Sequence, residues 1–489
     1  MAILSWMIFL PILTSIALFL LPLGLRATKL LSLAASLGVA ALSLWLYGHF
    51  EPTAAMQFVE HTPWIPPYGI SYHVGVDGVS LPLVMMVALL MPLIGIGLYN
   101  RDRKGVWLNL LLAQGGIMGA VLALDLMLFY LFWETMLLPI FFLIGLYGYG
   151  RHHFITMKFT IYTIFGSLMM LVGILFVAVT YYQQTGSFSF ALDDLKTITL
   201  SQREALFAFA AFMLAFAIKV PLFPFHTWLS DTYRSAPTGA VVVLSALMAK
   251  LGVYAIWRFL FTLFDATSHD LDIWFVALGL FGLIYFGIVA IRQQHIKRLF
   301  AYSSASHLSL MVVGIFIYDQ YGLTGAAYLI AAHALASGGL FIMVGMMYER
   351  TRTHAIDAMG GIATTAPRFA LFFALFSLAI VGVPGTAGFV AELLIILGAF
   401  HTHPVVGFVS ATTILIAMLF MFNLLTRTLY GKPAASAKPF EDLRPNEIVA
   451  LVPIALLILA MGIFPNLFLK KIEPTVEASI TAAKVHHAK

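Results

Sequence analysis

The sequence contains no cysteine and little charge. Without cysteine, the chain cannot form disulfides, thiolate zinc sites or cysteine-ligated iron–sulfur clusters of its own. Charged residues make up 10% of its 489 residues and hydrophobic residues 61%, whereas a soluble domain carries about 25% charged residues. The net charge of +5 comes from basic residues that are scattered rather than clustered, so a nucleic-acid partner is not expected. This composition predicts an integral membrane protein.

Long apolar runs separated by short polar breaks fill the chain. A helix needs about 20 apolar residues to cross a bilayer, so each run predicts one span. The first run, residues 3–21, lacks the basic flank of a signal peptide and is interpreted as a span that is retained. We expect an all-α integral membrane protein with about 14 transmembrane helices, near residues 2–21, 28–48, 79–99, 106–123, 126–147, 156–182, 204–233, 237–261, 271–291, 298–317, 322–348, 367–402, 404–430 and 446–468.

The basic residues predict the orientation of these helices. In this segmentation most of the 27 lysines and arginines fall into loops on one side. Positive charge is retained on the cytoplasmic side of bacterial membranes. We therefore expect a multi-pass protein of the bacterial inner membrane with both termini on the periplasmic side.

Two of the predicted spans contain helix-breaking residues. One reads "FAIKVPLFPFHTWL" (residues 216–229), and the other reads "VGVPGTAGFVAE" (residues 381–392). Unpaired backbone groups cost several kcal/mol in hydrocarbon, so a broken helix persists only inside protein or beside water. Paired interruptions indicate an inverted repeat with an ion site at each break. The expected organisation is an N-terminal part with helices 1–3 (1–105), two inverted five-helix repeats (106–262 and 271–430), and a C-terminal helix and tail (446–489).

Titratable residues lie inside these spans, where a charge at the bilayer centre costs about 2.5–3.5 kcal/mol even on the mildest scale. A structural role is the alternative, because a Glu–Lys pair can brace two helices and a histidine can bond a backbone carbonyl. Several such residues beside two breaks favour ion conduction. The candidates are Glu134, Lys219, Lys250, Glu392, His307, His333 and His226.

A nearby glutamate can change the proton affinity of a lysine by enough free energy to pump a proton. Burial lowers the proton affinity of a lysine by up to ~3–5 pKa units, and a nearby carboxylate restores it. Driving one charge against ~150–200 mV costs about 3.5–4.6 kcal/mol, or about three such units. Moving a lysine relative to a glutamate therefore changes its proton affinity by enough to drive a proton against this potential.

Three stretches resemble the proton-pumping antiporter-like subunits of respiratory complex I, the NADH:quinone oxidoreductase. They are "FAIKVPLFPFHTWLSDTYRSAPTGAVVVLSALMAKLGVYAIWR", "IKRLFAYSSASHLSLMVVGIF" and "HALASGGLFIMVGMMYERTRTHAI". The resemblance covers roughly residues 75–470. Within the family the sequence is similar to the M type (the mitochondrial subunit 4 type), because Glu392 stands where the sister subunits L and N typically carry lysine.

The resemblance implies a role for each candidate residue. Glu134 and Lys219 would form the pair that sets the proton affinity of the lysine, and Lys250 would be the central relay. The histidines His307 and His333 would carry protons through water toward the exit residue Glu392, and His226 would line the channel near the first break.

The resemblance also implies partners. The chain itself would hold no cofactor and perform no redox chemistry, while partner subunits would carry FMN, iron–sulfur clusters and quinone. The expected neighbours are the other complex I membrane subunits, especially L and N, and the lipid bilayer.

Other functions are weighed against this one. A subunit of a multi-subunit Mrp-type cation/proton antiporter, or of a membrane-bound hydrogenase, shares most of these motifs. A haem-binding electron carrier using His307 and His333 is disfavoured, because each helix supplies a single histidine. A passive scaffold would use the buried charges only for helix packing.

Overall fold

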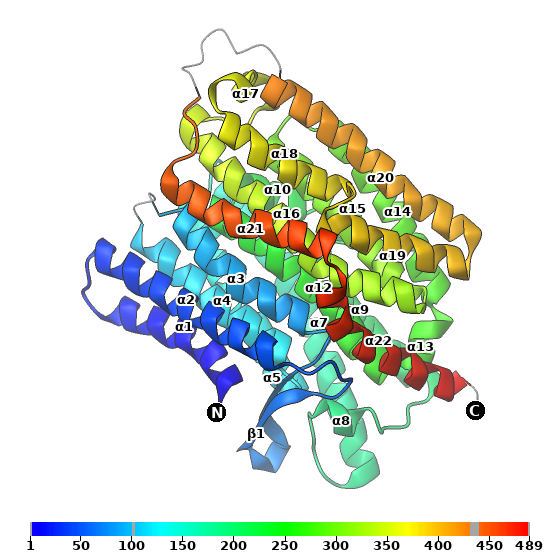
Figure 1. The fold of residues 1–489 in the computed structure, drawn as a ribbon. Coiled ribbons are helices and arrows are strands. Elements are labelled where there is room, and N and C mark those ends of the chain that lie inside the picture. The colour runs from blue at the N-terminus through cyan, green and yellow to red at the C-terminus, as the bar shows by residue number, and fades with distance from the viewer. Residues whose placement is uncertain (1, 100–102, 431–439, 488–489) are drawn as a thin grey trace.

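The structure is a computed structural model that describes residues 2–99, 103–430 and 440–487, with side chains described up to residue 481. Long helices run in a common direction and form one bundle (Figure 1). In the first part of the chain the helices are α1 (Ile3–Leu20), α2 (Leu25–His49), α3 (Leu81–Gly97), α4 (Lys104–Leu122), α5 (Leu126–Thr135), α6 (Leu137–Tyr147), α7 (His152–Thr185), α8 (Leu192–Leu195), α9 (Gln202–Lys219), α10 (Leu229–Ser235), α11 (Thr238–Val242) and α12 (Ala249–Ala255).

The remaining helices follow in the second part. They are α13 (Asp265–Asp270), α14 (Asp272–Ile291), α15 (Ile296–Phe316), α16 (Gln320–Thr351), α17 (Ile362–Thr365), α18 (Pro367–Val381), α19 (Ala387–Thr402), α20 (Pro404–Leu425), α21 (Pro445–Ile463) and α22 (Asn466–His487). Three π-helical turns are η2 (Val243–Met248), η3 (Ile256–Phe261) and η5 (Thr426–Tyr430), and two 3₁₀ turns are η1 (Pro66–Tyr68) and η4 (Ile356–Ala358).

The predicted helical membrane architecture is confirmed. Within the described ranges, eleven helical segments are long and apolar enough to cross a membrane. The other predicted spans correspond to the shorter apolar helix α3, to α9 with α10, and to α18 with α19. The exact number of crossings and the inverted repeats stay predictions.

A two-stranded β-hairpin interrupts the helices at one end of the bundle. Strands β1 (Gln57–Ile65) and β2 (Ile70–Val76) pair antiparallel, with His61 opposite His73. The all-α prediction included no strand here, because the segment lies between two predicted spans. The hairpin lies at the same end of the bundle as α8, the start of α1 and the end of α22 (Figure 1).

Helices end where the sequence removes backbone donors or relaxes the backbone. Proline lacks an N–H, and its ring clashes with the carbonyl four residues earlier, so α5 ends at Thr135, four residues before Pro139. The first predicted break begins at the end of α9, where Lys219 lies two residues before Pro221. The second begins at Gly382, which caps α18 with a φ of 73°, in the left-handed region that favours glycine.

The bundle has a protein-enclosed centre and an apolar outer surface. The segment Thr238–Phe261 and helix α16 are buried throughout their most apolar stretches, and α15 is almost as enclosed. Outer helices expose large apolar side chains instead, such as Phe19, Trp274 and Phe408. Because lipid would cover those outer faces, polar groups on the central helices are shielded from hydrocarbon by protein.

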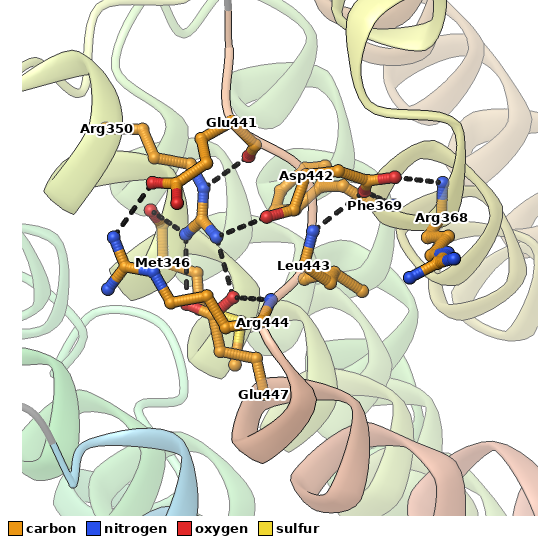
Figure 2. Close-up of polar contacts among 9 residues, drawn as sticks. All are labelled: Met346, Arg350, Arg368, Phe369, Glu441, Asp442, Leu443, Arg444 and Glu447. Carbon is orange, nitrogen blue, oxygen red and sulfur yellow. Dashed lines mark hydrogen bonds and ion pairs between the residues drawn. The ribbon is translucent and has the colours of Figure 1, made fainter.

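A buried arginine joins three helices at the end of the bundle opposite the hairpin (Figure 2). Arg350, near the end of α16, donates to both carboxylate oxygens of Glu447 in α21, at 3.0 and 2.6 Å, and to the backbone oxygens of Glu441 and Asp442. The Asp442 carboxylate in turn accepts from the backbone N–H of Phe369 in the first turn of α18, at 2.9 Å. This network fixes the ends of α16, α18 and α21 relative to one another.

A second buried ion pair lies at the hairpin end. Arg258 in η3 donates to Asp77, which follows β2, over 2.5 Å, and to the Tyr254 hydroxyl over 3.0 Å. Asp77 also accepts from the backbone of Ser80. Burial raises the pKa of the Asp77 carboxyl, but the Arg258 guanidinium and the Ser80 hydrogen bonds outweigh it and hold that pKa below its usual value.

Replacing Asp77 by asparagine should destabilise the protein strongly, since removing one partner of a buried ion pair typically costs about 3–5 kcal/mol. A depressed pKa in the fold means that this stability is present above the ordinary aspartate pKa of about 3.9. It is lost as the pH falls through the lower folded value. The unfolding midpoint in lipid nanodiscs should therefore be well below wild type at neutral pH, with the gap narrowing only in strong acid.

Asp193→Asn is the matched control for this prediction. Asp193 forms a 2.6 Å pair with Lys196 on the exposed helix α8, and an exposed pair contributes about 0–1 kcal/mol. Equal unfolding midpoints for Asp77→Asn and Asp193→Asn would show that the buried Asp77–Arg258 pair stabilises the protein no more than the exposed Asp193–Lys196 pair.

Candidate functional site

Glu134 and Lys219 are brought near each other by the ends of α5 and α9. Asp125 caps the start of α5 by accepting from the N–H groups of Met127 and Leu128. Glu134, at the other end of α5, is half-buried, and its Oε1 has no hydrogen-bond partner. Lys219 is 3% exposed, its Nζ also lacks a hydrogen-bond partner, and it lies 5.1 Å from the ring centroid of Trp133.

The Lys219 ammonium therefore has an aromatic face and the field of a nearby carboxylate, but no hydrogen bond. A cation is attracted by the face of tryptophan within about 6 Å, and the negative charge of Glu134 acts on the lysine through space. A buried charge held this weakly responds to small movements of its neighbours. That is the property required of a switch.

Lys219 also lies directly against the helix that carries Lys250. A Cβ placed on Gly252 would lie 3.2 Å from the Lys219 Cβ and 2.8 Å from the Val220 side chain. The absence of a side chain at Gly252 thus allows the end of α9 to approach α12. Gly252 follows Lys250 by two residues, a rise of about 3 Å along α12, and the two positions point about 200° apart around the helix.

Lys250 is fully buried, and its ammonium donates to the carbonyl oxygen of Ser245. Ser245 lies in the π-helical turn η2, and such turns occur frequently at functional sites. The Ser245 hydroxyl is 3.3 Å from the hydroxyl of Ser304 in α15. A hydroxyl both donates and accepts, so this pair connects the lysine to the neighbouring helix.

His307 and Glu392 form a buried pair in the second half of the chain. Both side chains are 1% exposed, and His307 Nε2 lies 3.3 Å from Glu392 Oε1. The same nitrogen is 3.0 Å from the carbonyl oxygen of Ile380, and Nδ1 is 2.8 Å from that of Ser303. Acceptors thus face both ring nitrogens, and only the protonated imidazolium donates from both. Glu392 is its counter-ion.

His333 lies beside this pair but differs from His307 in its hydrogen bonding. Its ring centroid is 5.1 Å from that of His307, and neither of its ring nitrogens has a hydrogen-bond partner. A cavity of about 10 Å³ adjoins it, lined in part by Ser303, Ser304 and Ser337, which is roughly the space that one water molecule needs. A histidine whose two ring nitrogens both face acceptors thus adjoins one whose ring nitrogens have no partner, and the cavity has room for a water on the Ser304 side.

The second break provides the space that the Glu392 side chain occupies. Gly382 ends α18 in a left-handed conformation, and a Cβ there would lie 2.9 Å from Glu392 Oε2. Glycine at this position therefore satisfies the backbone and leaves room for the carboxylate. The Ile380 carbonyl that accepts from His307 lies two residues before this cap, so the break supplies both the acceptor and the space.

His226 is placed apart from the other candidates. It is 7% exposed and lies among aromatic rings, at 5.8 Å from Phe223, 5.5 Å from Tyr285 and 4.9 Å from Phe286. Its Nδ1 has no hydrogen-bond partner. It thus lies in an aromatic pocket, within the stretch that forms the first break, and its role in a channel stays a prediction.

Sequence reasoning missed several polar residues between the candidates. They are Ser245, Ser303 and Ser304, together with Trp133. A signal was present in "AYSSASHLSL", where four serines surround His307 in an otherwise apolar span. Serines often bond their own helix, so the composition alone did not separate the connecting serines from the others.

Together these residues are a set of titratable and hydroxyl groups inside the bundle, with Glu134 half-buried, and we call this set the polar axis. Contacts connect Lys250 to Ser304 through Ser245, and His333 to Glu392 through His307. Within residues 2–99, 103–430 and 440–487 no group of three or more His, Asp or Glu side chains is arranged to hold a metal ion. The polar axis consists of Glu134, Lys219, Lys250, Ser245, Ser304, His333, His307 and Glu392.

Comparisons with known proteins agree on one family. The family model for NADH:quinone oxidoreductase/Mrp antiporter transmembrane proteins matches residues 123–424, more than half of the chain. NADH-quinone oxidoreductase subunit M from Rhodobacter capsulatus is 34% identical over 470 residues, covering 93% of this chain and 91% of the relative.

Solved structures of two complexes contain chains with the same fold as this chain. A chain of respiratory complex I from Thermus thermophilus with bound NADH superposes with a TM-score of 0.90 at 29% identity, over 99% of this chain and 100% of the other. A chain of the Mrp complex from a Dietzia species superposes with a TM-score of 0.89 at 19% identity, over 99% of each chain, which shows a shared fold alone. The chain belongs to the NADH:quinone oxidoreductase/Mrp antiporter transmembrane family, in the subunit M group.

Proposed function

We propose that this chain translocates protons across a membrane along the polar axis, as a membrane subunit of an NADH:quinone oxidoreductase. The observation that carries the proposal is the His307–Glu392 pair beside the unpartnered His333, buried at the centre of the bundle. Ionisable groups inside a membrane protein are costly and are found where ions or protons pass. Membership of the subunit M group supports the assignment to complex I.

The central transfer step follows from the protonation pattern. The His307 imidazolium holds a proton that its neighbour His333 lacks, and Glu392 stabilises the loaded state. Ring nitrogens exchange protons through one bridging water when they lie a few ångströms apart. A proton arriving from Lys250 through the Ser245–Ser304 hydroxyls and the adjoining cavity reaches His333 first, and His307 and Glu392 then form the exit.

Lys219 and Glu134 act as the switch at the other end. The lysine is held by a ring face and by a nearby carboxylate that acts through space, rather than by hydrogen bonds. A shift that brings the two charges together stabilises the ammonium, and a shift that separates them favours release of its proton toward Lys250. The required energy, about 3.5–4.6 kcal/mol for ~150–200 mV, lies within the range of such a change.

The wider organisation belongs to the same proposal. Residues 106–262 and 271–430 would be two inverted repeats, preceded by 1–105 and followed by 446–489. The chain would reside in the bacterial inner membrane with both termini periplasmic, beside sister subunits of the L and N types. Redox chemistry with FMN, iron–sulfur clusters and quinone would occur in partner subunits, and His226 would line the channel near the first break.

An Mrp-type antiporter subunit, or a membrane-bound hydrogenase subunit, is the alternative function. The family model includes both oxidoreductase and Mrp antiporter proteins, and the fold is shared. Proton conduction along the polar axis would be common to these functions. They differ in what drives it, so the deciding test compares NADH-driven pumping with sodium tolerance.

The first prediction from this proposed function concerns Glu134. Glu134→Gln removes the negative charge that acts on Lys219 but keeps the side-chain shape, so we expect both NADH oxidation and proton uptake in inverted vesicles to fall about tenfold or more, since a positioned proton-transfer group contributes ~10²–10⁴-fold. Native gels check that the complex is assembled. The matched control, Glu51→Gln, changes an exposed glutamate in the loop before β1 and should leave both activities unchanged.

Two outcomes would contradict parts of this prediction. Unchanged activities in Glu134→Gln would support the scaffold function, in which the charge serves only helix packing. Unchanged NADH-driven pumping combined with failure to grow in high sodium would instead favour the antiporter function.

The second prediction concerns Glu392. Glu392→Gln takes the counter-ion from the His307 imidazolium, so protons leave the histidine and the exit loses its carboxylate. We expect assembled complexes in which NADH-driven proton uptake falls about tenfold or more, while Glu392→Asp, which keeps the charge, retains part of the activity. A fully active Glu392→Gln variant would remove the pair from the pathway.

A further inference from the structure

A large polar cavity outside the polar axis opens at the end of the bundle opposite the hairpin. Its volume is about 490 Å³, and its lining includes Tyr149, Asp231, Ser235, His295 and Arg298. By the distribution of basic residues this is the cytoplasmic end. We call it the Tyr149 cavity. Nothing in the transfer steps described above uses it.

A buried lysine lies directly behind the wall of this cavity. Lys297, at the start of α15, is 1% exposed, and its Nζ donates to the carbonyl oxygen of Ala236 over 2.7 Å. The same nitrogen lies 5.1 Å from the ring centroid of Tyr149, which lines the cavity. Tyr149 is held in place by two hydrogen bonds with Ser235, of 2.7 and 2.8 Å. One aromatic ring thus lies between the lysine and the cavity.

The same helix connects this lysine to the polar axis. Ser304 follows Lys297 by seven residues, which places the two on one face of α15 about two turns, or roughly 10 Å, apart. His307 follows Ser304 on the next turn. Ser304 contacts Ser245, whose carbonyl accepts from Lys250. Lys297 is therefore the buried titratable group on α15 between the cavity and the axis.

Cationic side chains lie near Lys297. Arg234 and Arg298 line the cavity on its solvent side. Burial, followed by the charges of Lys297, Arg234 and Arg298, lowers the pKa of the neighbouring His295 to about 4, which shows how cationic this region is. Asp231 is shared between Lys158 and Arg298, at 3.0 Å from each. Lysine, unlike arginine, can give up its proton in such surroundings.

We propose that Lys297 is a further proton-carrying residue, which passes a proton from the Tyr149 cavity toward Ser304 and Lys250. In the step the Lys297 Nζ–H bond breaks, the proton moves inward through water to the hydroxyl pair, and the neutral amine regains a proton from cavity water. The inference rests on the proposed pumping function and adds its cytoplasmic entry. The competing role is purely structural, in which the ammonium only caps the Ala236 carbonyl after α10.

Lys297→Arg separates these two roles. Arginine keeps the positive charge and can donate to the Ala236 carbonyl, but it does not deprotonate in proteins. We expect assembled complexes with wild-type amounts on native gels, and NADH-driven proton uptake and coupled NADH oxidation lowered about tenfold or more. Lys158→Arg is the matched control, because Lys158 also donates to a backbone carbonyl, that of Thr227, on the same side. It should pump at the wild-type rate.

Normal pumping by Lys297→Arg would overturn the inference and leave Lys297 as a cap. If Lys297→Arg prevents assembly, the Lys297→Met variant distinguishes the two roles. The methionine side chain is unbranched and of similar length to lysine, but it cannot carry a proton. Assembled Lys297→Met complexes that do not pump support the inference, and those that pump normally overturn it. Glu134→Gln measured in parallel separates the hypotheses, because loss there with normal Lys297 variants rejects only the entry through Lys297.

Discussion

A polar group in the middle of a membrane must find its partners within the protein, because hydrocarbon offers none. The architecture around the polar axis follows from this constraint. The central segment Thr238–Phe261 and helices α15 and α16 are enclosed by others, and the outer helices expose apolar side chains. Breaks in α9–α10 and α18–α19 are tolerated at this depth because other helices surround them.

At each break, the backbone and the neighbouring side chains determine the surroundings of the charged residues beside it. The turn after α18 presents the Ile380 carbonyl to His307, and Gly382 leaves space for the Glu392 carboxylate. The end of α9 leaves the Lys219 ammonium without a hydrogen bond but near an aromatic ring and a carboxylate. One half therefore stabilises a proton and the other holds it loosely. Net transport also needs a driven change in these affinities, because a fixed difference only sets where a proton rests at equilibrium.

Buried ion pairs join the helices at both ends of the bundle. Arg350 joins α16, α18 and α21 at one end through bonds to a carboxylate and to backbone oxygens, and Arg258 with Asp77 fixes the hairpin end. Charge-assisted bonds of this type are short and geometrically specific. In the proposed function, these bonds would keep the helices in place while small displacements of Lys219 or His307 change proton affinity.

The sequence by itself determined the membrane-spanning helices, the two breaks and the identity of the buried charges. Hydrophobic length and the cost of charge in lipid leave few alternatives for residues such as Glu134, Lys250 and Glu392. Only the tertiary structure decided which of them adjoin. It paired His307 with Glu392, left His333 unpartnered and placed His226 apart among aromatic rings. It also revealed the hairpin and the role of Ser245 and Ser304, because these depend on contacts between residues far apart in the chain, which local periodicity does not encode.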